Sequence, residues 1–174
     1  MGSIPIRTTM NTNWISLKEH WQHLYDVAMK RENQKKDFPT PFKWKKFPPH
    51  FIGLCGEKIF SLVFGLPVNE DLIITGDGGY DFVVNGNKIN VKTTIYWHDP
   101  HLKEMINPKW WADYYFLVAL DTQRKRGRLC GWASQEELYN GYRQDYGYGS
   151  RLVVFNNELH TGTLPVLTES NRIG

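Results

Sequence analysis

The chain has 174 residues and a formal net charge of +3, with 41% hydrophobic and 22% charged residues. These proportions are ordinary for a soluble globular protein, and the length fits one domain, so we expect a single core over residues 1–174. The mild positive charge permits a nucleic-acid partner without requiring one.

Several protein classes can be set aside. The two cysteines, Cys55 and Cys130, are too few for a disulfide scaffold and lack the spacing of a zinc site, so we expect reduced core thiols. No run of 18 apolar residues and no apolar N-terminal segment is present, which argues against a membrane span and a signal peptide. The expected location is the cytoplasm.

Residues 1–48 are expected to form a helix followed by a basic, proline-rich connection. Ser16 and Glu19 have capping-box spacing, which predicts a helix start at Ser16, and apolar residues then recur at helical spacing. The connection alternates aromatic and basic residues around Lys43, Lys45 and Lys46. Two interpretations are about equally favoured. The segment either binds phosphates and bases or forms a solvated loop.

Residues 49–133 are expected to contain the catalytic core. The pattern predicts a mostly buried helix over Pro49–Phe64 that stops at Gly65, with Glu57 in an otherwise apolar surrounding. A buried glutamate needs a partner, because its isolated charge would be costly to bury. The expected strands, with a basic turn at Thr122–Arg128, are Leu72–Ile74, Tyr80–Val84, Asn87–Ile95, Tyr114–Leu120 and Leu129–Ala133.

Residues 134–174 are expected to hold a C-terminal helix, loops and one strand. Ser134 and Glu137 have capping-box spacing and predict the helix start, and Leu152–Phe155 reads as the strand. The whole chain is therefore predicted to be mixed α/β with a central sheet.

The hairpin joined by Asn85-Gly86 places polar residues together. If these two residues form the loop, Asp81 faces Asn90 across the strands and Lys92 shares their face. A four-residue loop keeps the same faces, whereas a three-residue loop would separate them. The opposite face is apolar and carries Phe82, Val84, Ile89 and Val91.

The order of Glu57 on a helix, then Asp81 in GDGGYDF, then Lys92 in INVKTT resembles the PD-(D/E)XK nuclease superfamily. It is most similar to small phage and Holliday-junction-resolvase-like members, and it covers about residues 50 to 97 closely. The resemblance implies a restriction-endonuclease-like core, with a central mixed sheet flanked by helices, and a metal-dependent endonuclease that hydrolyses phosphodiester bonds.

The resemblance also implies the site residues. Glu57, Asp81 and position 90 would hold Mg²⁺, or Mn²⁺ in its place, and Lys92 would stabilise the transition state. Asp77, in a glycine-rich turn, is a second-tier candidate. The implied partner is DNA, duplex or branched, and a homodimer is compatible with it.

Position 90 departs from the family pattern, which has an acid two residues before the lysine. Asn90 can offer an oxygen to a hard cation but brings no charge. Natural divergence and a deliberate Asp→Asn change are both open, and the second is slightly favoured because it keeps the shape of the side chain. The alternative function is a nucleic-acid-binding relative that does not cleave.

The basic turn is the second candidate for contact with nucleic acid. It clusters Arg124, Lys125, Arg126 and Arg128 at a hairpin-like tip. A solvated, charged loop tip is the simpler interpretation. Phosphate binding gains weight only if the chain is a nuclease.

Overall fold

The computed structural model describes residues 10–34, 47–68 and 78–162. Three groups of sequence-based predictions lie outside these residues. They are the strand Leu72–Ile74, the second-tier candidate Asp77, and the lysines Lys43, Lys45 and Lys46.

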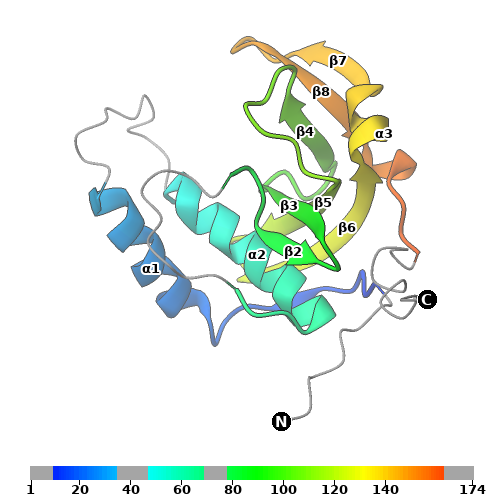
Figure 1. Cartoon of the computed structure of the whole chain (residues 1–174). Coiled ribbons are helices and arrows are strands. Elements are labelled where there is room, and N and C mark those ends of the chain that lie inside the picture. The colour runs from blue at the N-terminus through cyan, green and yellow to red at the C-terminus, as the bar shows by residue number, and fades with distance from the viewer. Residues whose placement is uncertain (1–9, 35–46, 69–77, 163–174) are drawn as a thin grey trace.

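The described residues form a mixed α/β fold in which the two long helices precede all but one short strand (Figure 1). The helices are α1 (Trp21–Gln34), α2 (Pro49–Phe64) and α3 (Gln135–Tyr139), with a 3-10 turn η1 (Asn156–Glu158). The strands are β1 (Ile15–Ser16), β2 (Phe82–Val84), β3 (Asn87–Thr94), β4 (His101–Met105), β5 (Tyr114–Asp121), β6 (Arg126–Ser134), β7 (Tyr142–Asp145) and β8 (Ser150–Phe155).

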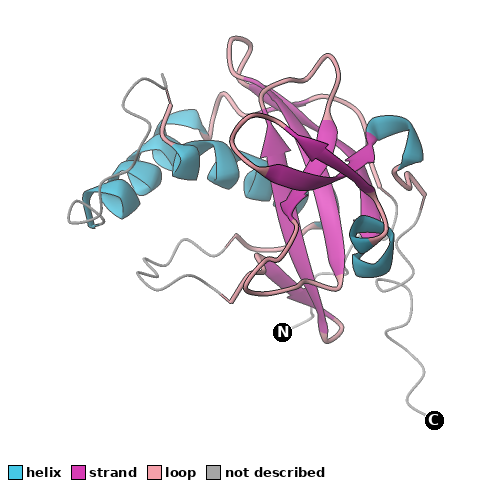
Figure 2. Ribbon diagram, turned by 90° about the horizontal axis from the view of Figure 1, so that it is seen from above, coloured by secondary structure: helices cyan, strands magenta, loops and turns pink. Residues whose placement is uncertain are grey.

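The strands form two sheets. The larger has the order β1-β6-β5-β3-β2, in which only β3 and β5 run parallel, and the smaller is antiparallel with the order β4-β8-β7. Seen from above, the strands gather together while α1 and α2 project to one side (Figure 2). The predicted central sheet and mixed α/β class are therefore confirmed.

Helix α2 has the predicted bounds. Pro49 occupies the first turn, where its missing N–H costs nothing, and Gly65 ends the helix in the left-handed region with φ 73°. The Gly65 N–H donates to the Ser61 carbonyl. No helix in the described part of the chain has the length and apolarity needed to cross a membrane.

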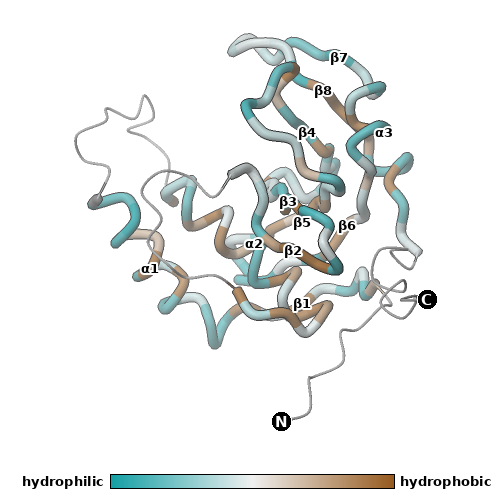
Figure 3. Tube along the Cα trace, viewed as in Figure 1, coloured by the Kyte–Doolittle hydropathy of each residue, from teal (hydrophilic) through white to brown (hydrophobic). Residues whose placement is uncertain are grey.

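The central strands separate two hydrophobic cores. Ile89 and Val91 of β3 belong to the core under α1 and α2, together with Phe116 of β5. The intervening residues of β5, such as Tyr115, belong to a second core beneath the smaller sheet. Figure 3 shows hydrophobic residues concentrated along α2 and the central strands. Each residue of β3 and β5 is thereby assigned to one face.

Helix α2 packs closely on β3 at one glycine. A Cβ atom added to Gly56 would lie 1.8 Å from the Thr93 hydroxyl, so only glycine fits there. At Gly53, by contrast, a Cβ atom would meet nothing within 4 Å. Close approach at Gly56 sets the helix beside the end of β3.

The β2–β3 hairpin has the predicted two-residue loop. Asn85 and Gly86 both have positive φ angles, 50° and 79°, as a type I′ turn requires. Phe82 pairs with Ile89 and Val84 with Asn87. The two-residue register used to place Asp81 near Asn90 is therefore confirmed.

Two parts of the secondary structure differ from the prediction. Ser16 does not begin a helix: it pairs with Arg126 as part of β1, and α1 starts only at Trp21. The exposed edge of β6 provides backbone partners there, and these outweigh the local capping signal. The basic turn is also shorter than predicted, because β6 already begins at Arg126.

We predict that Gly56→Ala lowers the free energy of unfolding by about 1–3 kcal/mol, because the new methyl group collides with Thr93. Gly53→Ala is the matched control on the same helix. It should raise stability by about 0.5–1 kcal/mol, because alanine favours the helix and meets no neighbour there. Urea denaturation measures both variants, and equal effects would contradict the close packing.

Candidate functional site

The turn before β2 is tied to β3 by three hydrogen bonds. The Asp81 N–H donates to the Ile89 carbonyl at 2.8 Å. The Asp81 carboxylate in turn accepts the Val91 N–H at 2.6 Å, and the Asn90 side-chain amide donates to the Gly79 carbonyl at 2.9 Å. Asp81 and Asn90 thus lie together, as the hairpin register predicts.

These bonds lie at an open edge of the large sheet. Strand β2 pairs only with residues 87–89 of β3, and among the described strands none pairs with β3 on this side from Asn90 onward. The Asp81 carboxylate takes the place of a backbone partner at Val91. An acid is therefore fixed at the edge where the ladder stops.

Lys92 projects from the face opposite to Val91 and makes a salt bridge across to the smaller sheet. Its ammonium lies 2.8 Å from the Glu104 carboxylate of β4. The Glu104 side chain is 9% exposed and that of Lys92 is 31% exposed. A carboxylate buried to this degree would be costly without its cation, so the pair fixes the lysine and joins the two sheets.

The surroundings of this ion pair are otherwise apolar. Tyr115 lies in the same core, and its hydroxyl accepts the Ala112 N–H at 3.0 Å. Burial raises the pKa of the Tyr115 phenol, and the charges of Glu104 and Asp113 raise it further, while the bond from Ala112 opposes them. Tyr115 therefore stays protonated, and Lys92 and Glu104 carry the charge on this face.

Glu57 lies on α2, which covers the other face of the large sheet. Gly56, its neighbour, packs against Thr93, and Thr93 shares a face with Ile89 and Val91. The sheet itself therefore does not bring Glu57 onto the face of Asn90 and Lys92. Glu57 is partly exposed, and its convergence with Asp81 and Asn90 on one metal site stays a prediction.

The candidate set fits a magnesium ion with few protein ligands. Among the described residues, no three His, Cys, Asp or Glu side chains come together to hold a metal. Asp81 provides one carboxylate, and Asn90 provides an amide oxygen, since its nitrogen is turned to Gly79. Mg²⁺ is commonly held by one or two carboxylates with waters and substrate phosphates, so one carboxylate and one amide oxygen are compatible with such an ion, and its binding stays a prediction.

The basic turn is held against the body of the protein. Arg124 and Arg126 both bond the buried Asp121 carboxylate, at 3.4 and 3.2 Å. The guanidinium groups of Arg126 and Arg128 also lie over the Trp14 ring, at 4.3 and 5.5 Å from its centroid. These contacts give the arginines a structural role, and their binding of phosphate stays a prediction.

Lys125, at the tip of the same turn, is held in a different way. It adopts a positive φ of 49°, and its ammonium lies 5.8 Å from the centroid of the Trp21 ring. It makes no acid contact comparable to that of Arg124, and it is exposed. Its binding of phosphate, like that of the three arginines, stays a prediction.

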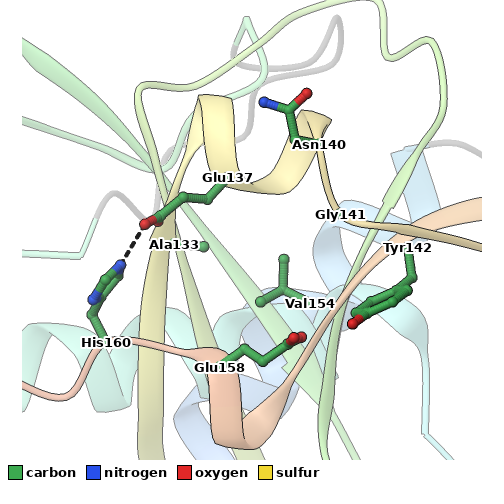
Figure 4. Close-up of a pocket in the computed structure, with 8 residues that line it drawn as sticks. All are labelled: Ala133, Glu137, Asn140, Gly141, Tyr142, Val154, Glu158 and His160. Atoms are coloured by element: carbon green, nitrogen blue, oxygen red, sulfur yellow. Dashed lines mark hydrogen bonds and ion pairs between the residues drawn. The ribbon is translucent and has the colours of Figure 1, made fainter.

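A second polar cluster surrounds a hollow of about 440 Å³ between α3 and β8 (Figure 4). Glu137 accepts from His160 at 2.5 Å and from the Ser134 N–H at 2.8 Å, so both of its oxygens are engaged. Burial would raise the pKa of Glu137, but the bonds from His160 and Ser134 outweigh it and hold the pKa low. This cluster anchors α3 to the segment after β8.

Neither cysteine is suited to nucleophilic chemistry. Cys55 and Cys130 are both buried and unbridged, as predicted. Burial raises the pKa of the Cys55 thiol to about 12 and raises that of Cys130 as well. Both thiols therefore remain protonated near neutral pH.

Sequence reasoning missed two residues of these clusters, Glu104 and His160. Glu104 lies on β4, a strand that sequence reasoning did not predict, and only the fold brings it to Lys92. His160, the partner of Glu137, is 23 residues away in the chain. Alternation within the segment His101–Met105, where Leu102 and Glu104 are buried, is the one signal that could have indicated an inward-facing acid.

Comparison of the chain with protein-family models, with curated proteins and with solved structures found no match in any of the three.

We predict that Asp121→Asn lowers stability at pH 7 by about 1.5–3 kcal/mol, because it weakens hydrogen bonds to a charged group. Burial would raise the pKa of Asp121, but the bonds from Arg124 and Arg126 lower it below the ordinary 3.8. The ionised carboxylate thus stabilises the fold at neutral pH, and this contribution is lost as the pH falls below 3.8 and through the lower folded-state pKa.

Urea denaturation of both proteins at pH 7 and pH 3 provides the test. The difference in stability between wild type and Asp121→Asn should shrink at the lower pH. A difference that stays constant would mean that Asp121 keeps the same pKa in the folded and unfolded chains.

Proposed function

We propose that this chain is a Mg²⁺-dependent endonuclease that hydrolyses DNA phosphodiester bonds on a restriction-endonuclease-like core. The observation that carries the proposal is that Asp81 bonds to β3 where its edge is open, beside Asn90 and near Lys92 on the same strand. A phosphate backbone can approach such an edge without displacing a strand. The order of helix, hairpin and parallel strand around it agrees with the same proposal.

Each residue has a distinct task in this proposal. Asp81 and the Asn90 oxygen hold the cation, and Glu57 is kept as a third ligand only because the resemblance implies it. When bound, the ion would lower the pKa of a water and stabilise the leaving oxygen. Lys92, kept in place by Glu104, donates to the charge that develops on the phosphate.

A specific observation also favours the second candidate, a nucleic-acid-binding protein that does not cleave. The Asn90 amide donates to the Gly79 carbonyl, and an ionised aspartate has no hydrogen to donate there. The asparagine is thus integrated into the turn, which favours natural divergence over a deliberate substitution. Cleavage by the unaltered chain separates the two candidates.

A test of the role of Lys92 must distinguish a loss of activity from a loss of folding. Removing Lys92 alone leaves Glu104 buried without its cation, at a cost of about 3–5 kcal/mol. We therefore predict that Lys92→Met is unstable, whereas Lys92→Met with Glu104→Gln folds and has lost about 10²–10³-fold in cleavage rate.

The matched control is Glu104→Gln alone, which keeps Lys92 and removes only its partner's charge. It should retain more activity than the double variant. Plasmid, branched and single-stranded DNA serve as substrates with Mg²⁺, after thermal melting has shown that each variant is folded. Equal activity in the double variant and in wild type would remove Lys92 from the mechanism.

Asn90→Asp should raise Mg²⁺-dependent cleavage and destabilise the metal-free protein. The change removes the bond to Gly79 and adds a second carboxylate beside Asp81, at a cost of about 1–3 kcal/mol. A divalent ion between the two acids should restore part of that loss, so the melting temperature should rise more with Mg²⁺ than in wild type. An equal Mg²⁺ response in both proteins would show that position 90 is not a ligand.

A further inference from the structure

The outer face of the smaller sheet is built differently from its inner face. On β4 and β8 the inward residues Leu102, Leu152 and Val154 join the second core. The strand register therefore turns the alternate residues outward. These outward residues of the three strands are His101, Lys103, Met105, Arg151, Val153, Phe155, Tyr142 and Gln144.

Aromatic rings cover much of this outer face. Phe155 lies at the end of β8, paired with His101, and its ring centroid is 4.9 Å from that of His101 and 5.0 Å from that of Tyr142. The turn between β7 and β8 adds Tyr146 and Tyr148, whose rings are stacked with an interplanar angle of 21°. Tyr142 is 56% exposed and Tyr148 is 64% exposed. Large aromatic rings with this exposure favour the binding of a partner that has flat, stackable surfaces.

Cations stand directly beside these rings. The Lys103 ammonium lies 3.8 Å from the centroid of Tyr146, and the Arg151 guanidinium lies 5.4 Å from that of Tyr148. The outward positions of β4, β7 and β8 contain no aspartate or glutamate. The face therefore combines stacking surfaces with positive charge, which is complementary to bases joined by phosphates.

Unpaired nucleic acid has base faces that are accessible for stacking. In a duplex the bases are stacked on one another, so their faces are covered. Aromatic and basic sheet surfaces bind single strands by stacking successive bases and contacting the backbone. A face three strands wide spans about 10 Å. That width suits two or three nucleotides.

We propose that the outer face of β4, β8 and β7 binds an unpaired segment of DNA by stacking bases on Tyr142 and Tyr148, with Lys103 and Arg151 contacting phosphates. The choice of DNA as occupant rests on the proposed nuclease function. The same strand β4 carries Glu104 on its inner side, so this surface and the Lys92 site share one element. The chain thereby selects substrates that contain a single-stranded region.

The test is fluorescence anisotropy of the full chain with a labelled 15-nucleotide oligo-dT in EDTA, where no metal-dependent cleavage occurs. The wild-type chain should bind oligo-dT more tightly than a 15-base-pair duplex. Tyr142→Leu and Tyr148→Leu should each weaken binding by roughly 5- to 100-fold. Tyr139→Leu is the matched control, since Tyr139 is 57% exposed but lies on α3, and it should bind like wild type.

The charged residues are tested by salt dependence. Lys103→Gln and Arg151→Gln should each flatten the slope of log affinity against log salt by about 0.7. Lys18→Gln, at an exposed lysine near the start of α1, should leave it unchanged. Tyr148 lies at an exposed turn, so its variant remains informative even if Tyr142→Leu does not fold.

Several results would overturn the proposal. They are equal affinity for duplex and single strand, tyrosine variants that bind like wild type, binding of oligo-U but not oligo-dT, or binding of phosphatidylserine vesicles without any binding of oligo-dT. Failure of the nuclease proposal looks different. Tight, tyrosine-dependent binding of oligo-dT without cleavage in Mg²⁺ would support this surface and refute cleavage.

Discussion

The strict alternation of side chains along β3 and β5 is the constraint on which the rest of the structure depends. Because these two parallel strands are paired residue by residue, every side chain is committed to one of two faces of the sheet. Ile89 and Val91 take the side of α2, which leaves Asn90 and Lys92 to the other side. A polar face then needs polar partners, and the smaller sheet provides one in Glu104.

This arrangement joins stability to the candidate chemistry. The buried Glu104 carboxylate requires a cation, and Lys92 is fixed in place by meeting that requirement. Likewise, the bonds made by Asn90 and Asp81 hold the turn before β2 and fix the Asp81 carboxylate at the edge of β3. The same contacts thus serve the fold and the proposed site, and substitutions there must be interpreted with folding measured beside activity.

Local signals predicted those elements whose residues carry strong local preferences. Helix α2 was predicted because Pro49 and Gly65 mark its ends, and the hairpin because Asn85-Gly86 suits only a tight turn. Strands β4 and β7 were not predicted. In the case of β7 the reason is that the strand is exposed along its whole length and has no apolar face of its own. The Lys92–Glu104 pair could not be inferred because it depends on how two sheets pack. The helix start predicted at Ser16 was wrong, because a long-range pairing with β6 outweighed the local capping signal.

The central claim is that a divalent cation binds beside Asp81 at the open edge of β3. Paramagnetic broadening of backbone amide NMR signals during titration with Mn²⁺ tests it most directly and does not depend on catalysis. The account predicts that the signals of Asp81, Val91 and Lys92 broaden first and that Asp81→Asn abolishes the effect. Broadening centred instead on Glu137 and Glu158, with the Asp81 and Val91 signals unchanged, would contradict it.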